Sequence, residues 1–239
     1  MNKEKSALLL VNVGTPDNPS VNAVRRYLFQ FLNDPRVIDL PWLARKILVN
    51  LIIVPFRATK SAKLYKRLWT KEGSPLLINS LKLKDKLQSK LDGEADVFIA
   101  MRYGEPSIKK TIESIRTGGY KNVIILPMFP QYASSTSGTA IQAVFKEMEN
   151  WNTIPFVHTI SKFYDHPALL EAFTQRIATY KPQEYDYVLF SYHGLPNSHN
   201  DKSHPEIAST SCSCEKAMPS HGRFCYKASC YETTRQLVD

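Results

Sequence analysis

Residues 7–13 read Ala-Leu-Leu-Leu-Val-Asn-Val, an almost uninterrupted apolar run near the start of the chain. A strand with one face in water would alternate apolar and polar residues. A continuous apolar run is instead typical of a strand that is buried on both faces of a parallel sheet. Gly14-Thr15-Pro16 follows and favours a turn. The next segment predicts a helix, because its apolar residues recur at helical spacing: Val21, Val24, Leu28, Phe31 and Leu32.

Four more apolar segments follow along the chain and predict strands: Val97–Met101, Val123–Met128, Ile154–Ile160 and Tyr187–Phe190. Amphipathic patterns of helical period separate them. Strands that alternate with helices predict right-handed βαβ units, and therefore an α/β fold with parallel sheets flanked by helices. We expect a first domain over residues 1–165. Residues 166–239 would hold a connecting helix and the start of a second, incomplete domain, with a cysteine-rich insert at 197–230.

The composition narrows the classes of protein. The 239 residues carry a formal net charge of +9, which is not concentrated in any block of like charge. Dispersed charge is typical of a solvated surface, and an anionic ligand or an acidic membrane surface are the alternatives. We expect no nucleic-acid partner, because no nucleic-acid-binding module is recognisable.

The N-terminus lacks a signal-peptide layout, and the apolar stretch Ile47–Phe56 falls short of the ~20 residues that span a membrane. We expect a cytoplasmic protein.

Ligands in parallel α/β folds bind outside the carboxyl ends of the strands, so the residues that follow each strand are the candidates for a site. His193 lies directly after the segment Tyr187–Phe190, within Ser-Tyr-His-Gly-Leu-Pro at 191–196. An imidazole can accept a proton or bind a metal near neutral pH. The alternative is a structural histidine that caps the strand end.

Two other strand ends carry polar groups. Residues 129–138 include five hydroxyl-bearing side chains between a predicted strand and a helix, which would suit an anionic group. A helix cap explains one or two of them. Arg102, followed by Tyr103, ends the preceding strand and could hold a carboxylate through two parallel hydrogen bonds. A surface ion pair is the alternative for this arginine.

All four cysteines lie within nineteen residues, at Cys212, Cys214, Cys225 and Cys230. A disulfide scaffold would distribute cysteines through the chain, so the grouping predicts a metal centre with four thiolate ligands. A [2Fe–2S] cluster and a tetrahedral zinc ion are both compatible with four thiolates, and the spacing does not match the CxxC pairs of common zinc ribbons.

Six motifs together resemble the ferrochelatase family, in family order and along nearly the whole chain. They are Leu10–Pro16 (LVNVGTP), Phe31–Ile38 (FLNDPRVI), Gly73–Leu76 (GSPL), Met101–Tyr103 (MRY), Pro130–Tyr132 (PQY) with Ser135-Thr136, and Ser191–Pro196 (SYHGLP). The resemblance implies insertion of Fe²⁺, which is a substrate, into protoporphyrin IX in the last step of haem synthesis. It also implies two similar α/β domains with a porphyrin cleft between them.

The resemblance assigns roles to particular residues. His193 matches the family's metal-site histidine and catalytic residue. The positions expected to line the cleft or bind the porphyrin propionates are Arg36, Ser74, Arg102, Tyr103, Tyr132, Ser135 and Thr136. The apolar segment Trp42–Phe56, within a lip at about residues 40–57, matches the part of the family that guards the pocket and touches the membrane. The cysteines resemble those of bacterial members with an internal [2Fe–2S] cluster.

The sequence also departs from the family. The later SFQSR-like strand and the segment with the catalytic glutamate do not occur, so we expect a fragment whose own activity is in question. The alternatives for function are a related class II chelatase that inserts cobalt, and a non-catalytic domain that binds porphyrin or a cluster. Protoporphyrin and coproporphyrin are both compatible as the substrate.

Overall fold

A computed structural model of the chain describes residues 6–203 and 207–238. The described chain divides into two units. Unit 1 comprises the residues up to Met128 together with Ser135–Ser161, and unit 2 comprises Phe129–Ser134 and the residues from Lys162 onward. The predicted boundary after residue 165 stays a prediction.

Unit 1 is built on a four-stranded parallel sheet with the order β2-β1-β3-β4. The central strand β1 pairs with a neighbour on each side; its Leu8, for example, lies opposite Val97 and Ile124. The apolar run at residues 7–13 therefore forms the strand predicted for it, and its residues from Ala7 to Val11 are buried. The strand bounds are β1 Ser6–Gly14, β2 Ala95–Tyr103, β3 Asn122–Pro127 and β4 Phe156–Thr159.

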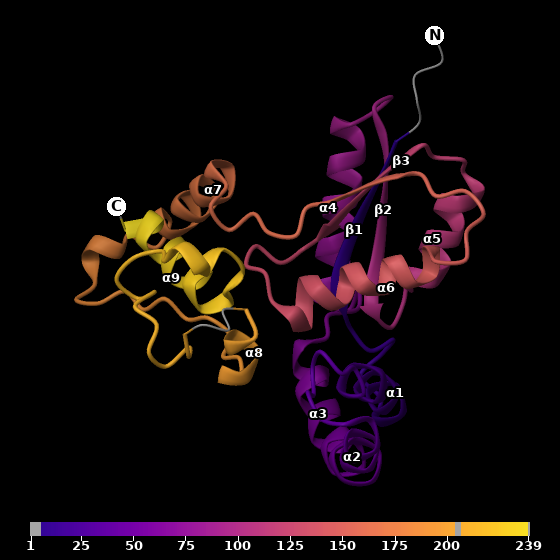
Figure 1. Cartoon of the computed structure of the whole chain (residues 1–239), viewed down its shortest axis with the longest axis horizontal. Helices are drawn as coiled ribbons and strands as arrows, with labels where there is room; N and C mark the ends of the chain where they lie inside the picture. Colours follow the sequence, from indigo (N-terminus) through magenta and orange to yellow (C-terminus); the bar gives the residue numbers. More distant parts are fainter. Residues whose placement is uncertain (1–5, 204–206, 239) are drawn as a thin grey trace. The chain divides into compact units, whose positions relative to one another are not determined.

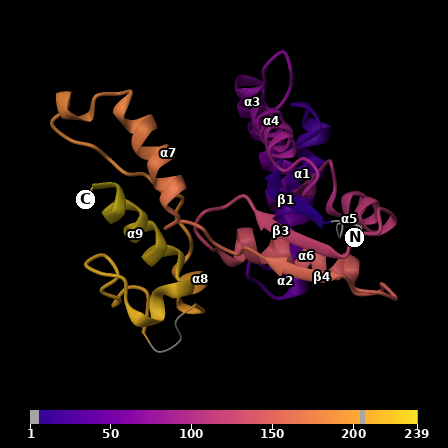
Figure 2. The same cartoon turned by 90° about the horizontal axis from the view of Figure 1, so that it is seen from above.

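Helices cover both faces of this sheet, which confirms the predicted α/β class (Figures 1 and 2). Helix α4 (Pro75–Lys90) packs against one face, where leucines such as Leu83 and Leu87 meet Leu8, Leu10 and Val97. Helices α5 (Ile108–Thr117) and α6 (Thr139–Met148) pack against the other. The residues buried together on this second face include Ala7, Leu9, Val11, Ile112, Ile115, Ala140 and Val144.

A helical subdomain follows the carboxyl end of β1 (Figure 1). It consists of α1 (Val21–Leu32), α2 (Trp42–Ile47), a π-helical segment at Leu48–Ile53, and α3 (Val54–Leu68). One face of the lip segment is buried against α1 through residues such as Val49 and Val54. Buried Arg45 fixes the lip to the end of α1, because its Nε donates to the carbonyl of Asn33 at 3.0 Å and its Nη1 to that of Leu40 at 2.6 Å.

Two glycines allow the ends of β1 and β2 to approach each other closely. Gly14 has φ +105°, and a Cβ there would lie 1.8 Å from the carbonyl oxygen of Tyr103. Gly104 has φ +87°, and a Cβ there would lie 2.7 Å from the carbonyl oxygen of Thr15. Residues other than glycine are excluded at both positions, because their Cβ would clash with backbone atoms and because the positive φ is unfavourable for them. The polar residues at the ends of these two strands are thereby brought together.

Unit 2 contains helices α7 (Pro167–Ala178), α8 (Asn197–Asp201) and α9 (Tyr226–Val238), with 3₁₀ turns at Pro182–Glu184 and Ser220–Phe224. Its described residues include no strand, so the strand predicted at Tyr187–Phe190 is wrong for this structure. A strand requires a neighbour to satisfy its backbone hydrogen bonds, and none is present there. The side chains of Tyr187 and Leu189 are 87% and 91% exposed.

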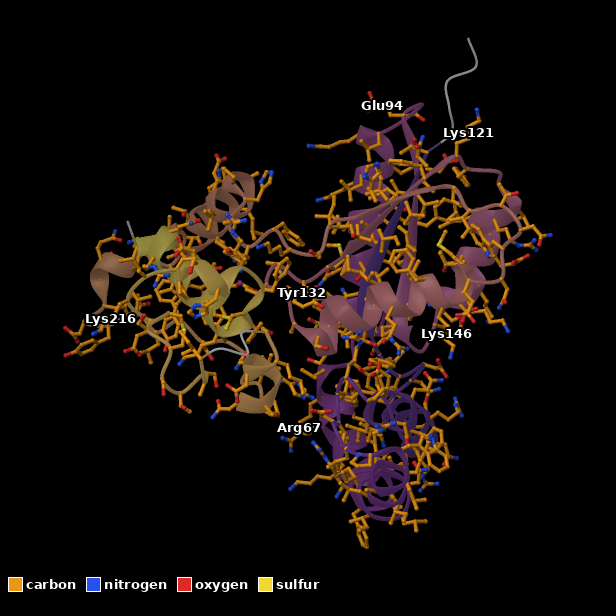
Figure 3. All side chains as sticks on the ribbon, viewed as in Figure 1. Arg67, Glu94, Lys121, Tyr132, Lys146 and Lys216 are labelled. Atoms are coloured by element: carbon orange, nitrogen blue, oxygen red, sulfur yellow. The ribbon has the colours of Figure 1, made fainter. Side chains whose placement is uncertain are left out.

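Charged side chains lie on the surfaces of both units. Figure 3 shows the side chains of Arg67, Glu94, Lys121, Lys146 and Lys216 at the surfaces of the two units, and all five are exposed. Among the helices of residues 6–203 and 207–238, none has the length and apolar character that crossing a membrane requires.

Candidate functional site

The most densely connected polar group of unit 1 is the carboxylate of Asp34, just beyond the C-terminus of α1. Its Oδ2 accepts hydrogen bonds from Arg102 Nη2 at 2.7 Å, from the Tyr103 hydroxyl at 2.8 Å and from the Thr139 hydroxyl. Its Oδ1 accepts from the backbone amide of Arg36 at 2.8 Å. The carboxylate thus joins the end of α1 to the end of β2 and the start of α6.

The ionised form of the Asp34 carboxyl group is favoured although its side chain is only 3% exposed. Burial alone would raise the pKa of this carboxyl group. The hydrogen bonds from Thr139, Tyr103 and the Arg36 amide, together with the positive charge of Arg102, outweigh that effect and lower the pKa below its usual value.

Arg102 is held from several sides at the carboxyl end of β2. Besides its ion pair with Asp34, its Nε donates to the Thr139 hydroxyl at 2.7 Å. Its guanidinium lies over the Tyr103 ring, 4.6 Å from the centroid. The side chain remains 26% exposed and lines a cavity of about 270 Å³ outside the carboxyl ends of β1 and β2. This is the edge at which such sheets bind ligands.

The other predicted residues of unit 1 differ in their surroundings. Arg36 lies beside the Asp34 network, and its Nε donates to Gln142 Oε1 at 2.7 Å. Tyr103 is buried, so its hydroxyl acts on Asp34 rather than on a solvent-filled space. Ser74 is buried at the start of α4. Ser135 and Thr136 lie in a π-helical turn, Ser134–Gly138, directly before α6.

Two predicted residues belong to unit 2. Tyr132 packs edge-on against Phe224, with 6.2 Å between the ring centroids. His193 lines a cavity of about 410 Å³ together with residues of α9. The loop that carries it contacts α9 at two points. The Tyr192 hydroxyl lies 2.9 Å from the Thr234 hydroxyl, and the backbone of His193 hydrogen-bonds to Tyr226.

The four cysteines lie close together in unit 2, and all are buried free thiols. Cys212, Cys214 and Cys225 share one small apolar cluster with Ala228, and Cys230 lies within α9. Burial, together with the smaller effect of neighbouring cysteines, raises the pKa of Cys214 and of Cys230 to about 11. Cys212 Sγ also lies 3.4 Å from His221 Nε2. Four thiols in one short segment are a donor set that suits a thiolate-ligated metal centre.

These thiols lie near one another, but they are not arranged as the ligands of a single metal ion. Across the part of the chain that the structure describes, no three His, Cys, Asp or Glu side chains are grouped so that they could hold one ion. The predicted centre therefore remains a prediction.

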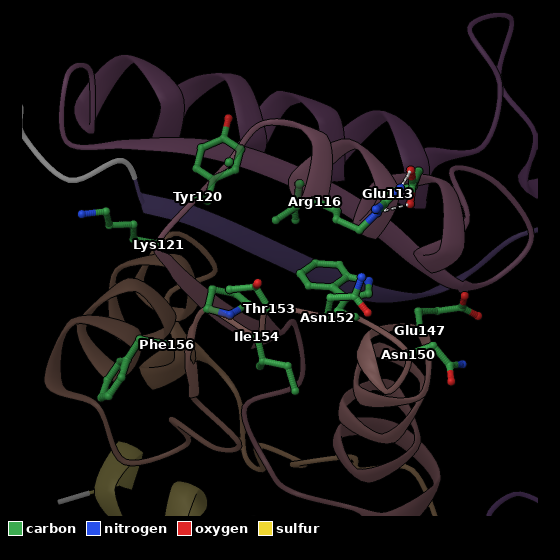
Figure 4. A pocket seen from close by; sticks show the side chains of 14 residues that line it. Glu113, Arg116, Tyr120, Lys121, Glu147, Asn150, Asn152, Thr153, Ile154 and Phe156 are labelled. Carbon is green, nitrogen blue, oxygen red and sulfur yellow. Dashed lines mark hydrogen bonds and ion pairs between the residues drawn. The ribbon is translucent and has the colours of Figure 1, made fainter.

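Another cavity of unit 1, of about 810 Å³, lies at the amino ends of β3 and β4 (Figure 4). It is lined by Lys121, Trp151 and Ile154 among others, and Arg116 in its wall is paired with Glu113. None of the predicted site residues lines it. Its size alone does not make it the candidate site, because parallel sheets bind ligands at the opposite edge.

Three residues of these networks were missed from the sequence: Asp34, Thr139 and His221. Asp34 stands inside the quoted segment FLNDPRVI, and Thr139 directly follows the hydroxyl-rich loop. Their positions within or next to these segments were therefore the sequence feature that could have identified them. His221 had none beyond its place between two of the cysteines.

The sheet and the polar groups at its carboxyl edge define an α/β protein with a candidate ligand site at the ends of its strands. Comparison with known proteins specifies the family. The ferrochelatase family matches residues 5–239, so this chain belongs to the ferrochelatase family. The resemblance read from the motifs is thereby confirmed.

Curated relatives carry the same name. The chain is 42% identical to the ferrochelatase of Coxiella burnetii (strain CbuG_Q212), over 99% of this chain and 66% of that protein. It is 41% identical to the ferrochelatase of Legionella pneumophila (strain Paris), over 98% of this chain and 69% of that protein. For the ferrochelatase of Opitutus terrae the identity is 43%, over 97% and 68%. The chain thus spans about two thirds of the length of these relatives.

Replacing Arg102 by leucine would leave the buried Asp34 carboxylate without its countercharge. We expect Arg102→Leu to lower the free energy of unfolding by about 3 kcal/mol at neutral pH, measured by chemical denaturation. The pKa of Asp34 in the folded protein is lowered, so the stability that it contributes is present above its unfolded pKa of about 4 and is lost as the pH falls through the folded value. The difference between the two proteins should therefore shrink below about pH 4.

Arg116→Leu is the control, because it breaks an exposed ion pair with Glu113 in the same unit and should change stability little. Equal effects of the two substitutions would contradict the importance of the Asp34 network.

Proposed function

We propose that this chain acts in the ferrochelatase reaction, in which Fe²⁺ is inserted into protoporphyrin IX to form protohaem, and that it does so in the cytoplasm. The observation that carries the proposal is the family match across residues 5–239. The relatives named above are all ferrochelatases, and nothing favours cobalt insertion. Two pyrrole N–H protons must leave as the iron binds, so the reaction requires a proton acceptor as well as a metal path.

His193 is the residue that we assign to this proton and metal chemistry. Its support is the cavity of about 410 Å³ that it lines and the two contacts that hold its loop against α9. A neutral imidazole has one free lone pair, which can take up a pyrrole proton or pass on a ferrous ion.

Arg102 is the residue that we assign to a porphyrin carboxylate. It is a partly exposed cation at the carboxyl edge of the sheet, and it lines a cavity. Arg36, Ser74, Tyr132, Ser135 and Thr136 are proposed to complete the contacts with substrate. Tyr103 would act through Asp34, because its hydroxyl is buried there.

We also propose a [2Fe–2S] cluster held by Cys212, Cys214, Cys225 and Cys230. The number and burial of the thiols support it, and zinc is the rival because four thiolates suit both centres. When bound, the cluster would link the four cysteines through metal–sulfur bonds and so hold in place a segment that is poor in apolar residues. Cys230 and Tyr226 lie on the helix that contacts the His193 loop, so loss of the centre would disturb that loop.

The lip is proposed to make peripheral contact with a membrane. Its outer face bears large apolar side chains, among them Trp42 and Phe56 at 65% and 78% exposed. Exposed cations, Arg57 and Lys60, follow on α3. Apolar anchors beside basic residues are the composition of an interfacial helix that lies on an anionic membrane.

His193→Ala is expected to lower haem formation from Fe²⁺ and protoporphyrin IX about 100-fold or more, because a proton acceptor or metal ligand is lost at the reacting centre. Binding of porphyrin should remain. Anaerobic assays at the haem absorption band measure the first quantity, and fluorescence titration measures the second. His158→Ala, an exposed histidine of β4, is the control. Activity of His193→Ala within about tenfold of the unchanged chain would refute the assignment.

Cys225→Ser is expected to abolish the visible absorption of the anaerobically purified protein and to lower its melting temperature, because one ligand is lost. Iron, sulfide and zinc contents measured in parallel identify the metal. Ser213→Ala, an exposed neighbour of two cysteines, should retain both colour and stability. If the unsubstituted protein is colourless and contains one zinc ion and no sulfide, the centre is a zinc site and not a [2Fe–2S] cluster.

The double substitution Leu51→Ser and Phe56→Ser is expected to weaken binding to phosphatidylglycerol vesicles about tenfold or more, since each large side chain contributes about 1.5–3 kcal/mol when it leaves water. Flotation of the vesicles measures the bound fraction. Ile154→Ser with Phe156→Ser removes equally exposed apolar residues from unit 1 outside the lip. If the two pairs of substitutions have the same effect, the lip is not the contact.

A further inference from the structure

His221 has no part in the proposed function, although it lies beside one of the proposed cluster ligands. Its Nε2 is 3.4 Å from Cys212 Sγ, which is a normal separation for a hydrogen bond between an N–H group and the large sulfur atom. Cys212 is only 7% exposed, so water competes little for this contact. The imidazole is therefore a close neighbour of any metal centre that Cys212 helps to hold.

The 3₁₀ turn that carries this histidine, Ser220–Phe224, is fixed through its backbone. At its end, the amide of Cys225, the next proposed ligand, donates to the carbonyl of Gly222 at 3.0 Å. On another side, Lys162 Nζ donates to the carbonyl of Arg223 at 2.6 Å. The position of the imidazole beside the sulfur thus follows from the conformation of the turn, and the same turn also places the next cysteine.

The four thiols lie as two adjoining pairs. Cys214 hydrogen-bonds to Cys212, and Cys225 is the cysteine whose charge affects the pKa of Cys230. Cys225 also packs with the first pair in the apolar cluster. A [2Fe–2S] cluster takes two thiolates on each iron, whereas tetrahedral zinc takes all four around one ion. The described residues contain no group of three ligands for one ion, so the thiols fit a two-iron centre better than zinc.

The chemistry of a ligated sulfur decides the direction of the hydrogen bond from His221. A thiolate bound to iron has lone pairs but no proton, so the imidazole must be the donor, with its Nε2 protonated. Reduction adds one negative charge to the cluster and its sulfur ligands. An N–H donor therefore stabilises the reduced form more than the oxidised form, and hydrogen bonds to the sulfurs are among the factors that set the reduction potential.

We propose that His221 is a positioning residue of the cluster, whose Nε2–H donates a hydrogen bond to the Cys212 thiolate and raises the reduction potential. The inference rests on the proposed function, since it requires the [2Fe–2S] cluster, and it adds a residue outside the four ligands. The hydrogen bond also ties Cys212 to the turn that precedes Cys225. One ligand from each pair is thereby held at a fixed separation.

Two substitutions of His221 separate the hydrogen bond from the shape of the side chain. His221→Phe keeps a ring but removes the donor, and His221→Gln keeps an N–H donor. The midpoint potential of the anaerobically purified chain is measured by titration with dithionite, followed at the visible absorption bands. We expect His221→Phe to lower the ratio of reduced to oxidised cluster about tenfold at a fixed potential, which is about 59 mV for one electron.

His221→Gln should stay close to the unsubstituted chain. Ser220→Ala, an exposed neighbour in the same turn, is the matched control and should leave the potential unchanged. An unchanged potential in His221→Phe, or equal shifts in the phenylalanine and glutamine variants, would overturn the proposal while the cluster itself stands.

Pulsed electron paramagnetic resonance of the reduced, unsubstituted chain supplies a test that does not depend on whether the variants retain the cluster. With ¹⁵N-labelled histidine, we expect a weak hyperfine coupling to one histidine nitrogen, carried through the N–H···S contact. No coupling, or the strong coupling of an imidazole bound directly to iron, would overturn the proposal. A chain that contains zinc and no sulfide would overturn the proposed cluster, and the inference with it.

Discussion

Four hydrogen bonds to one buried carboxylate organise the carboxyl edge of unit 1. Asp34 comes just after α1, whereas its side-chain partners lie 68, 69 and 105 residues later in the chain. Removing a carboxylate from water is costly unless its oxygens are fully paired, so the donors must stay in place for the fold to be stable. The positions of the β2 end, the α6 start and the α1 end are thus mutually dependent. Arg102, which lines the cavity at this edge, obtains its orientation from this network.

The two units illustrate different sources of order. Unit 1 is held by apolar residues on both faces of a sheet, and its strands satisfy one another's backbone groups. The described part of unit 2 has a small apolar cluster, in which three of the four buried residues are cysteines. A segment that buries so little apolar surface gains most of its stability from additional links. The His193 loop depends on α9 and hence on the cysteine-rich segment.

The sequence predicted those parts of the fold that local pattern determines. The continuous apolar run at Ala7–Val13 indicated a central strand, and the alternation of strands and helices indicated the parallel sheet. Both are confirmed. The same pattern misled at Tyr187–Phe190, because an apolar segment becomes a strand only where a neighbour offers hydrogen bonds. Asp34 was not predicted, since its role depends on contacts across as many as 105 residues. The periodic pattern of apolar residues gives no information about such long-range contacts. For the cysteines, grouping in sequence did indicate grouping in space, whereas the proximity of His221 to Cys212 required coordinates.

The paired glycines at the ends of β1 and β2 also constrain how this protein can evolve. Each lies against the backbone of the opposite strand end, so neither clash can be relieved by trimming a neighbouring side chain. A substitution at Gly14 or Gly104 has no compensating partner elsewhere in the chain, because the obstructing atom is a main-chain carbonyl that every amino acid possesses. Exposed residues that line the cavity beside Arg102, such as Asp17 and Arg26, meet no such backbone obstacle. Substitutions at this edge of the sheet are therefore tolerated in those side chains, whereas the turn geometry at Gly14 and Gly104 admits glycine alone.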